Sequence, residues 1–200
     1  MQPTETAETV KNRSFTAALP SVKFQTAAAI IAVVAAVALP QVFHVAGAAL
    51  GLGAMVGQTL LPMHLPVLLV GLLAGPFAGL ATGAFAPIVS FLLTGMPMAP
   101  MVPFMVIELA AYGLFAGLLR GVRLPAAVPS PLGWLVKLVG AQVAGRIADA
   151  LAIAVAVSLL GNTTMTVASV AAAVVTGLPG LALQWVLVPV IMTAVDRRRD

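Results

Sequence analysis

The stretch HLPVLLVGLLAGPFAGLATGAF, residues 64–85, contains no charged side chain and is interrupted at one point, Gly75-Pro76. A helix that crosses the hydrocarbon core of a bilayer needs about 20 predominantly apolar residues. Apolar runs lie on both sides of the Gly-Pro pair, over 63–75 and over 77–95. Because glycine and proline end helical runs, the pair predicts a turn between two membrane-spanning helices.

The rest of the chain has the same apolar character. Its 200 residues are 61% hydrophobic and 8% charged, whereas soluble domains are about 25% charged. Cysteine is absent, which excludes disulfides, thiolate metal sites and cysteine nucleophiles. The net charge of +4 comes from short basic tracts beside apolar runs, a pattern typical of topology signals and not of nucleic-acid binding. The composition predicts an all-α integral membrane protein in a lipid bilayer.

Six apolar runs predict six transmembrane helices. They cover roughly 22–39, 63–75, 77–95, 102–119, 133–160 and 165–195. Basic residues stand before or at the start of the first run, between the fourth run and the start of the fifth, and after the sixth, and the loops expected outside contain none. These residues are Lys11, Arg13, Lys23, Arg120, Arg123, Lys137, Arg197, Arg198 and Arg199. The positive-inside rule therefore predicts cytoplasmic termini for a multi-pass protein of the cell (inner, cytoplasmic) membrane.

The chain divides accordingly into one membrane domain and two tails. Residues 1–20 are polar and show no signal-peptide pattern, so we expect a cytoplasmic N-terminal tail. Residues 21–196 are expected to form the six-helix domain, and 197–200 a basic cytoplasmic tail. Residues 40–62 are expected to form a long first external loop.

The second run is short for a membrane span. Its 13 residues make a helix of about 20 Å, whereas the hydrocarbon core is about 30 Å thick. Either this helix begins earlier, near Gly53, or the glycine-rich segment 40–62 enters the membrane as a re-entrant cover. The second arrangement requires backbone that is buried in protein or lines a cavity.

Three charged residues fall deep inside the predicted spans: Glu108, Arg146 and Asp149. Arg146 and Asp149 are three residues apart, so they share a helix face and are expected to form a structural ion pair. Glu108 can approach Arg146 if the fourth and fifth spans are neighbours. Because such residues persist in a membrane only when paired or facing water, they predict either a network that fixes helix register or a polar binding site.

The hexapeptide PMHLPV (62–67) places His64 between two prolines. Pro66 has no N–H and frees a carbonyl in the turn before it, which predicts a kinked helix start and a polar notch on the outer side. Other polar residues are expected at similar outer depth, with Gln184 deeper. The predicted substrate-binding residues are His64, Glu108, Arg146, Met63, Gln58, His44, Asn162 and Gln184.

Small residues recur at four-residue spacing, which lets helix backbones approach closely. Two glycine sets, Gly71 to Gly83 and Gly113 to Gly121, predict packing between helices of the same chain. The set Ala28, Ala32 and Ala36 lies on the first span, where it either packs internally or docks a separate membrane subunit. Motifs for zinc hydrolases, serine hydrolases, nucleotide binding and thiol redox chemistry are absent from the sequence. The chain is therefore not expected to be an enzyme.

Five segments in order resemble the substrate-binding S-components of energy-coupling factor (ECF) transporters. They are FHVAG (43–47), LLPMHLPVLLVGLLAGPFAG (60–79), SFLLTGMP (90–97), PFMVIELAAYGLFAGLL (103–119) and GRI (145–147). The resemblance covers most of residues 22–195. It implies a six-helix subunit that binds a vitamin or similar micronutrient in its outer half.

The resemblance also implies partners. S-components dock on one transmembrane coupling subunit and two cytoplasmic ATPases, so ATP is used only by the partners and the chain has no cofactor of its own. By this resemblance Ala28, Ala32 and Ala36 would contact the coupling subunit, and 40–62 would close over the ligand.

Other readings of the same residues remain open. A tetrapyrrole such as cobalamin or haem would account for His44, His64 and the methionines at 63, 96, 98, 101 and 105. An intramembrane enzyme would use His44, His64 and Glu108 as a metal or acid–base site. In a scaffold, the polar residues would only fix helix packing.

Overall fold

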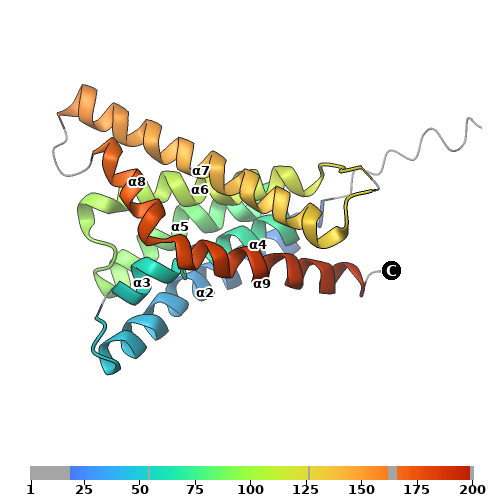
Figure 1. Cartoon of the computed structure of the whole chain (residues 1–200), viewed down its shortest axis with the longest axis horizontal. Helices are drawn as coiled ribbons and strands as arrows, with labels where there is room; N and C mark the ends of the chain where they lie inside the picture. The colour runs from blue at the N-terminus through green and yellow to red at the C-terminus, as the bar shows by residue number, and fades with distance from the viewer. Residues whose placement is uncertain (1–18, 54, 126, 162–165, 199–200) are drawn as a thin grey trace, which may run out of the picture.

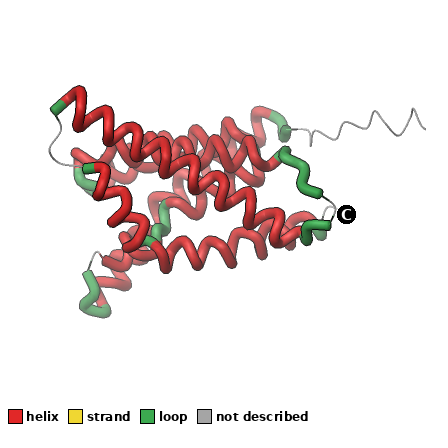
Figure 2. The backbone as a smooth tube through the Cα atoms, turned by 45° about the horizontal axis from the view of Figure 1, so that its top comes forward, coloured by secondary structure: helices red, strands yellow, loops and turns green. Residues whose placement is uncertain are grey.

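The described chain is helical, and the helices lie alongside one another (Figure 1, Figure 2). The computed structural model describes residues 19–53, 55–125, 127–161 and 166–198, and these ranges contain no strand. The elements are α2 (Val22–Ala49), α3 (Met55–Leu60), α4 (His64–Ala74), α5 (Pro76–Thr94), the 3-10 turn η1 (Ala99–Met101), α6 (Val102–Arg120), α7 (Ser130–Leu160), α8 (Val167–Thr176) and α9 (Leu178–Asp196). Within the described residues, six helical units are long and apolar enough to cross a membrane. The prediction of an all-α chain with six helices of membrane-spanning length and apolarity is confirmed.

The first span is longer than its hydropathy predicts. The expected run ends before Pro40, but α2 continues through this proline to Ala49. A proline removes one hydrogen bond from a helix, and membrane helices tolerate it when neighbouring groups satisfy the freed carbonyl. With 28 residues, α2 is about 42 Å long. The prediction that 40–62 forms one long loop is therefore wrong, since its first ten residues belong to α2 and 55–60 form α3.

The second span is an interrupted helix. Together α3 and α4 form an apolar unit of 20 residues over 55–74. Leu61 between them has a left-handed φ of 49°, and Pro62 follows, so the helix cannot run straight through. His64 becomes the first residue of α4. The predicted earlier start near Gly53 is close to the observed one, but the helix that begins there is broken.

The predicted turn at Gly75-Pro76 is confirmed. Gly75 has a φ of 112°, which glycine adopts at far lower cost than residues with a Cβ. Pro76 is the first residue of α5, where its missing N–H has no intrahelical partner to lose. One residue is thus enough to join α4 to α5.

Glycines bring α4 and α5 against α6. A Cβ on Gly71 of α4 would lie 2.5 Å from the carbonyl oxygen of Gly113 on α6, and a Cβ on Gly79 of α5 would collide with the same peptide group. Further along α5, a Cβ on Gly83 would collide with the backbone of Leu109. The predicted internal role of these glycines is confirmed, and α6 becomes the central helix of this group.

The alanine stripe on α2 is also used inside the fold. Ala32 and Ala36 are buried, and Ala32 packs in one cluster with Ala74 of α4 and Ala78 of α5, with Ala28 at its edge. A side chain packed inside the protein cannot contact a separate subunit at the same time. The predicted role of Ala28, Ala32 and Ala36 as a coupling-subunit contact is therefore wrong for Ala32 and Ala36.

The last predicted span, 165–195, divides into α8 and α9 at Gly177. The start of α9 packs against the interruption between α3 and α4. A Cβ on Gly180 would lie 2.5 Å from the carbonyl carbon of Leu60, and one on Gly177 would lie 2.8 Å from the Leu61 side chain. The two helix interruptions therefore touch each other.

The opposite end of the molecule is basic. The end of α6, the start of α7 and the end of α9 lie near the C-terminus, whereas α3 and α8 lie at the other end (Figure 1). Trp134 Nε1 donates a hydrogen bond to Asp196 Oδ2 at 2.7 Å, and Lys137 Nζ donates to the Arg120 carbonyl oxygen at 3.0 Å. These contacts tie α6, α7 and α9 together at the end where the basic residues lie.

Candidate functional site

Three ionisable side chains from three helices meet in the interior. Arg146 Nη1 on α7 lies 2.7 Å from Glu108 Oε1 on α6, and His64 Nε2 on α4 lies 3.8 Å from the same oxygen. The side chains of His64, Glu108 and Arg146 are only 7%, 8% and 16% exposed. A lone charge in mid-membrane costs about 2.5–3.5 kcal/mol on insertion scales, so the ion pair explains how both residues are retained. The predicted approach of Glu108 to Arg146 is confirmed.

His64 is the member of this cluster whose hydrogen-bonding groups have the fewest partners. Among the described residues, neither ring nitrogen has a hydrogen-bond partner, and 3.8 Å to Glu108 is too long for a direct bond. Its ring packs against Tyr112, with the centroids 5.3 Å apart and the planes at 57°. Because buried polar groups almost always have partners, His64 requires a hydrogen bond from water or from a bound molecule.

The sequence around each residue explains why the three meet. Tyr112 follows Glu108 by one helical turn, so both lie on the same face of α6. Gly145 precedes Arg146, and a Cβ at this glycine would collide with the Tyr112 ring. The missing side chain lets α7 approach α6 closely enough for Arg146 to reach Glu108. The break before α4 brings His64 into the same region.

A cavity of about 390 Å³ lies beside this cluster. Its volume falls within the usual range of small-molecule sites, about 300–1,000 Å³. The lining comes from α2, α3, the α3–α4 interruption, the start of α4, α5, the segment 96–101, α6, α7 and α8, at the end away from the C-terminus. The polar side chains of the lining are Gln41, His44, Gln58, His64, Ser90, Glu108, Arg146 and Thr176.

Methionine supplies much of the apolar wall. Of the nine methionines in the chain, five line the cavity, and they come from the α3–α4 interruption, the segment before α6 and α6 itself. These are Met63, Met96, Met98, Met101 and Met105. Thioether side chains are flexible and polarisable, so they adapt to ligand shape and make favourable contacts with aromatic rings. The wall therefore favours a flat or aromatic group.

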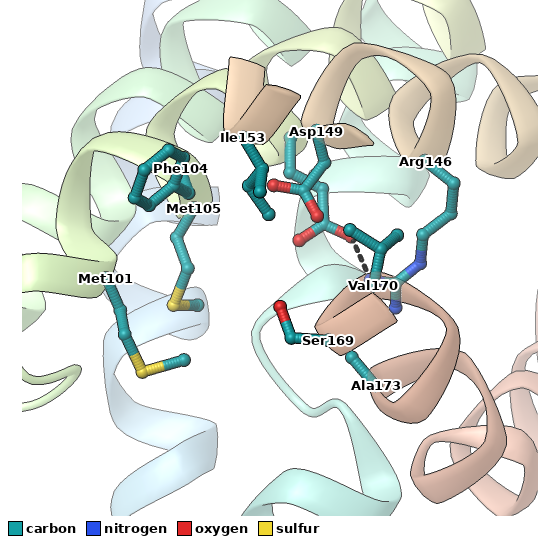
Figure 3. A pocket seen from close by; sticks show the side chains of 10 residues that line it. Met101, Phe104, Met105, Arg146, Asp149, Ile153, Ser169, Val170 and Ala173 are labelled. Carbon is teal, nitrogen blue, oxygen red and sulfur yellow. Dashed lines mark ion pairs between the residues drawn. The ribbon is translucent and has the colours of Figure 1, made fainter. Parts of the chain in front are cut away.

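The same ion pair also lines a second, smaller cavity of about 70 Å³ (Figure 3). It shares part of its lining with the large cavity, including Glu108, Arg146 and Ala173. Asp149 and Ser169 line only the small one. Within the described residues, no ion pair joins Arg146 to Asp149. The predicted Arg146–Asp149 pair is wrong, because the guanidinium reaches across to α6 instead.

A chain of hydrogen bonds between side-chain amides connects α7 and α9 to the α3–α4 interruption. Gln142 Nε2 on α7 donates to Gln184 Oε1 on α9 at 2.9 Å, and Gln184 Nε2 donates to the Leu61 carbonyl oxygen at 3.4 Å. Trp185 Nε1 donates to Gln142 Oε1 at 2.8 Å. Gln184 is buried and lines neither of the two cavities. Its predicted role in substrate binding stays a prediction, and in this structure it hydrogen-bonds the helix interruption.

Most of the other predicted binding residues line the large cavity. They are His44, Gln58, Met63, His64, Glu108 and Arg146, and Asn162 lies outside the described residues. Gln41 and Ser90 also line the cavity and were not predicted. Gln41 falls in the segment expected to be a loop, and Ser90 lies within an apolar run, where a small hydroxyl gives no distinct signal.

The cavity can bind a small molecule through an apolar wall and a few convergent polar groups. Within the part of the chain that the structure describes, no group of three or more His, Cys, Asp and Glu is placed to hold a metal ion. No protein-family model matches the chain, and neither a curated protein nor a solved structure matches it.

Proposed function

We propose that this chain is the substrate-binding S-component of an ECF-type importer for a vitamin or related micronutrient. The observation that carries the proposal is the cavity of about 390 Å³ on which His64, Glu108 and Arg146 converge inside a six-span protein. Polar groups are expensive in a membrane interior and usually mark a functional pathway or site. A helix scaffold alone does not account for a cavity of this size beside a histidine that has no hydrogen-bond partner among the described residues.

The charge distribution supports capture from outside. The basic residues after α6 and α9 lie at the end opposite α3 and α8, and basic residues favour the cytoplasmic side. In this orientation both termini are cytoplasmic, the protein lies in the cytoplasmic membrane, and the cavity lies in the outer half. The ligand then reaches the cell interior only if the subunit moves or opens.

The partners proposed for that step are a transmembrane coupling subunit and two cytoplasmic ATPases. Because Ala32 and Ala36 are buried, the docking surface belongs to other residues of the lateral face. This face is strongly apolar: Ile30, Ile31 and Val34 of α2 are each more than half exposed. A face without charges lowers the cost of tilting the subunit in the bilayer.

The size of the cavity favours a ligand of one or two rings. At about 390 Å³ it is near the lower end of the usual range, so a tetrapyrrole would need the walls to move apart. The methionines and His44 would otherwise suit such a ligand. An absorbance scan of protein extracted from its host tests this alternative, since tetrapyrroles absorb strongly in the visible.

Native mass spectrometry of gently extracted protein tests the proposal directly. We expect a small molecule to co-purify and to be lost from Ala173→Trp, because Ala173 of α8 lines both cavities. The matched control is Ala171→Trp, on an exposed position of the same helix outside the cavity linings. Equal retention of the molecule by the two variants would contradict binding in this cavity.

Transport is tested separately in proteoliposomes. Uptake of the co-purifying molecule should require the coupling subunit, the ATPases and ATP. Equal accumulation with and without this module would leave a binding protein but defeat the importer assignment.

A further inference from the structure

The structure contains a buried carboxylate that the ion pair does not use. Asp149 is only 6% exposed, yet within the described residues it has neither a hydrogen-bond partner nor an ion-pair partner. Its carboxylate points into the small cavity, toward the wall that carries Ser169 and Ala173 (Figure 3). Removing a charged group from water without a partner is costly, so the ionised form of Asp149 needs a compensating positive group.

The charges around the two cavities do not balance. Two carboxylates, Glu108 and Asp149, face a single guanidinium, Arg146, which lies 2.7 Å from Glu108. Arg146 is therefore already paired with Glu108, and with a neutral His64 the charge of an ionised Asp149 has no counterpart among these side chains. His64 lines the large cavity and does not line the small one.

We propose that the ligand is an organic cation whose charged nitrogen enters the small cavity between Asp149 and Glu108. This inference rests on the proposed function and specifies its substrate class. The ring of the ligand lies in the large cavity against the methionines, and the cationic nitrogen reaches past Glu108, which lines both cavities. A volume of about 70 Å³ admits an ammonium or amidinium group but not a ring.

A carboxylate-bearing ligand fits the same site poorly. It would have to displace Glu108 from Arg146 while lying near Asp149, and like charges in a buried site repel strongly. An inorganic cation also fits poorly, because hard metal ions take about six or more oxygen ligands. The side chains that line the small cavity offer oxygens from only Glu108, Asp149 and Ser169, and the rest of its described wall is apolar apart from Arg146.

Three probes of nearly equal shape test the charge preference. Benzamidine is a cation, benzamide is neutral and benzoate is an anion. In calorimetric titrations of the full chain in nanodiscs, we expect benzamidine to bind at least about tenfold more tightly than the other two, as complementary charge at a buried site allows. Asp149→Asn should remove this preference. Asp196→Asn, at the opposite end beside Trp134, should keep it.

Several results would overturn the inference. They are equal or weaker binding of benzamidine, no binding of any probe, an unchanged preference in Asp149→Asn, and stabilisation by Na⁺ that depends on Asp149 without a benzamidine preference. If Asp149→Asn does not fold, the three probes on the unmodified chain still decide. A neutral or anionic molecule found by native mass spectrometry would refute the cation class while leaving the proposed binding function intact.

Discussion

Removing Arg146 should destabilise the protein more than removing its partner Glu108. Arg146→Met leaves Glu108 and Asp149 buried with no cation beside them. Glu108→Gln instead leaves Arg146, and Asp149 lies three residues away on the same helix face, where it can accept the guanidinium. Loss of one partner of a buried pair typically costs about 3–5 kcal/mol. We expect Arg146→Met to reach that range and Glu108→Gln about half of it.

Thermal unfolding in detergent measures the difference. For a chain of this size, 1 kcal/mol corresponds to about 2–4 °C in Tm, so Arg146→Met should lower the Tm by roughly 10 °C and Glu108→Gln by roughly half as much. The double variant should lose less than the sum of the two, because the residues are directly coupled. A Glu108→Gln variant that is as unstable as Arg146→Met would refute the reasoning, since it would mean that Asp149 cannot take over.

The glycine interface and the amide chain give further predictions. Gly79→Ala should lower the Tm by several degrees, because its Cβ would collide with the Gly113 backbone and overpacking typically costs about 1–3 kcal/mol. Gly121→Ala is the matched control, since its Cβ would meet one atom, at 4.0 Å; a similar loss there would argue against close packing. Gln184→Leu should cost about 1–3 kcal/mol by leaving the buried Gln142 Nε2 without its acceptor, and an unchanged Tm would show that the amide chain is dispensable.

Hydropathy and turn chemistry were enough to predict the number and order of the spans. Apolar length identifies a membrane helix without reference to its neighbours, and a Gly-Pro pair such as Gly75-Pro76 marks a turn on local grounds. The Glu108–Arg146 contact was also within reach, because two opposite charges in a membrane interior have few other ways to be satisfied.

Hydropathy could not predict which face of each helix meets lipid and which packs against protein. A membrane helix is apolar on the side that meets lipid and on the side that meets protein, so Ala32 looked equally suited to a partner subunit and to the core. The same limit applies to Pro40, which ends a helix in water but not where neighbours compensate. Whether Arg146 pairs with Glu108 or with Asp149 depends on how close α6 lies to α7. Gly145 allows the close approach, because a Cβ there would collide with Tyr112 of α6.

The position of the cavity follows from the two interrupted helices. Each interruption leaves backbone carbonyls without helical partners, and in a membrane these must be satisfied inside the protein. The Leu61 carbonyl accepts hydrogen bonds from the His64 backbone N–H and from Gln184 Nε2 of α9, and Gly180 lets α9 approach Leu60 closely. The two breaks therefore pack against each other. The short helices α3 and α8 lie at the end of the molecule away from the C-terminus (Figure 1). Neither break is crossed by a continuous helix, which leaves space for the cavity beside them. A polar cavity can form there without exposing backbone to lipid, and His64, as the first residue after the break, faces into it.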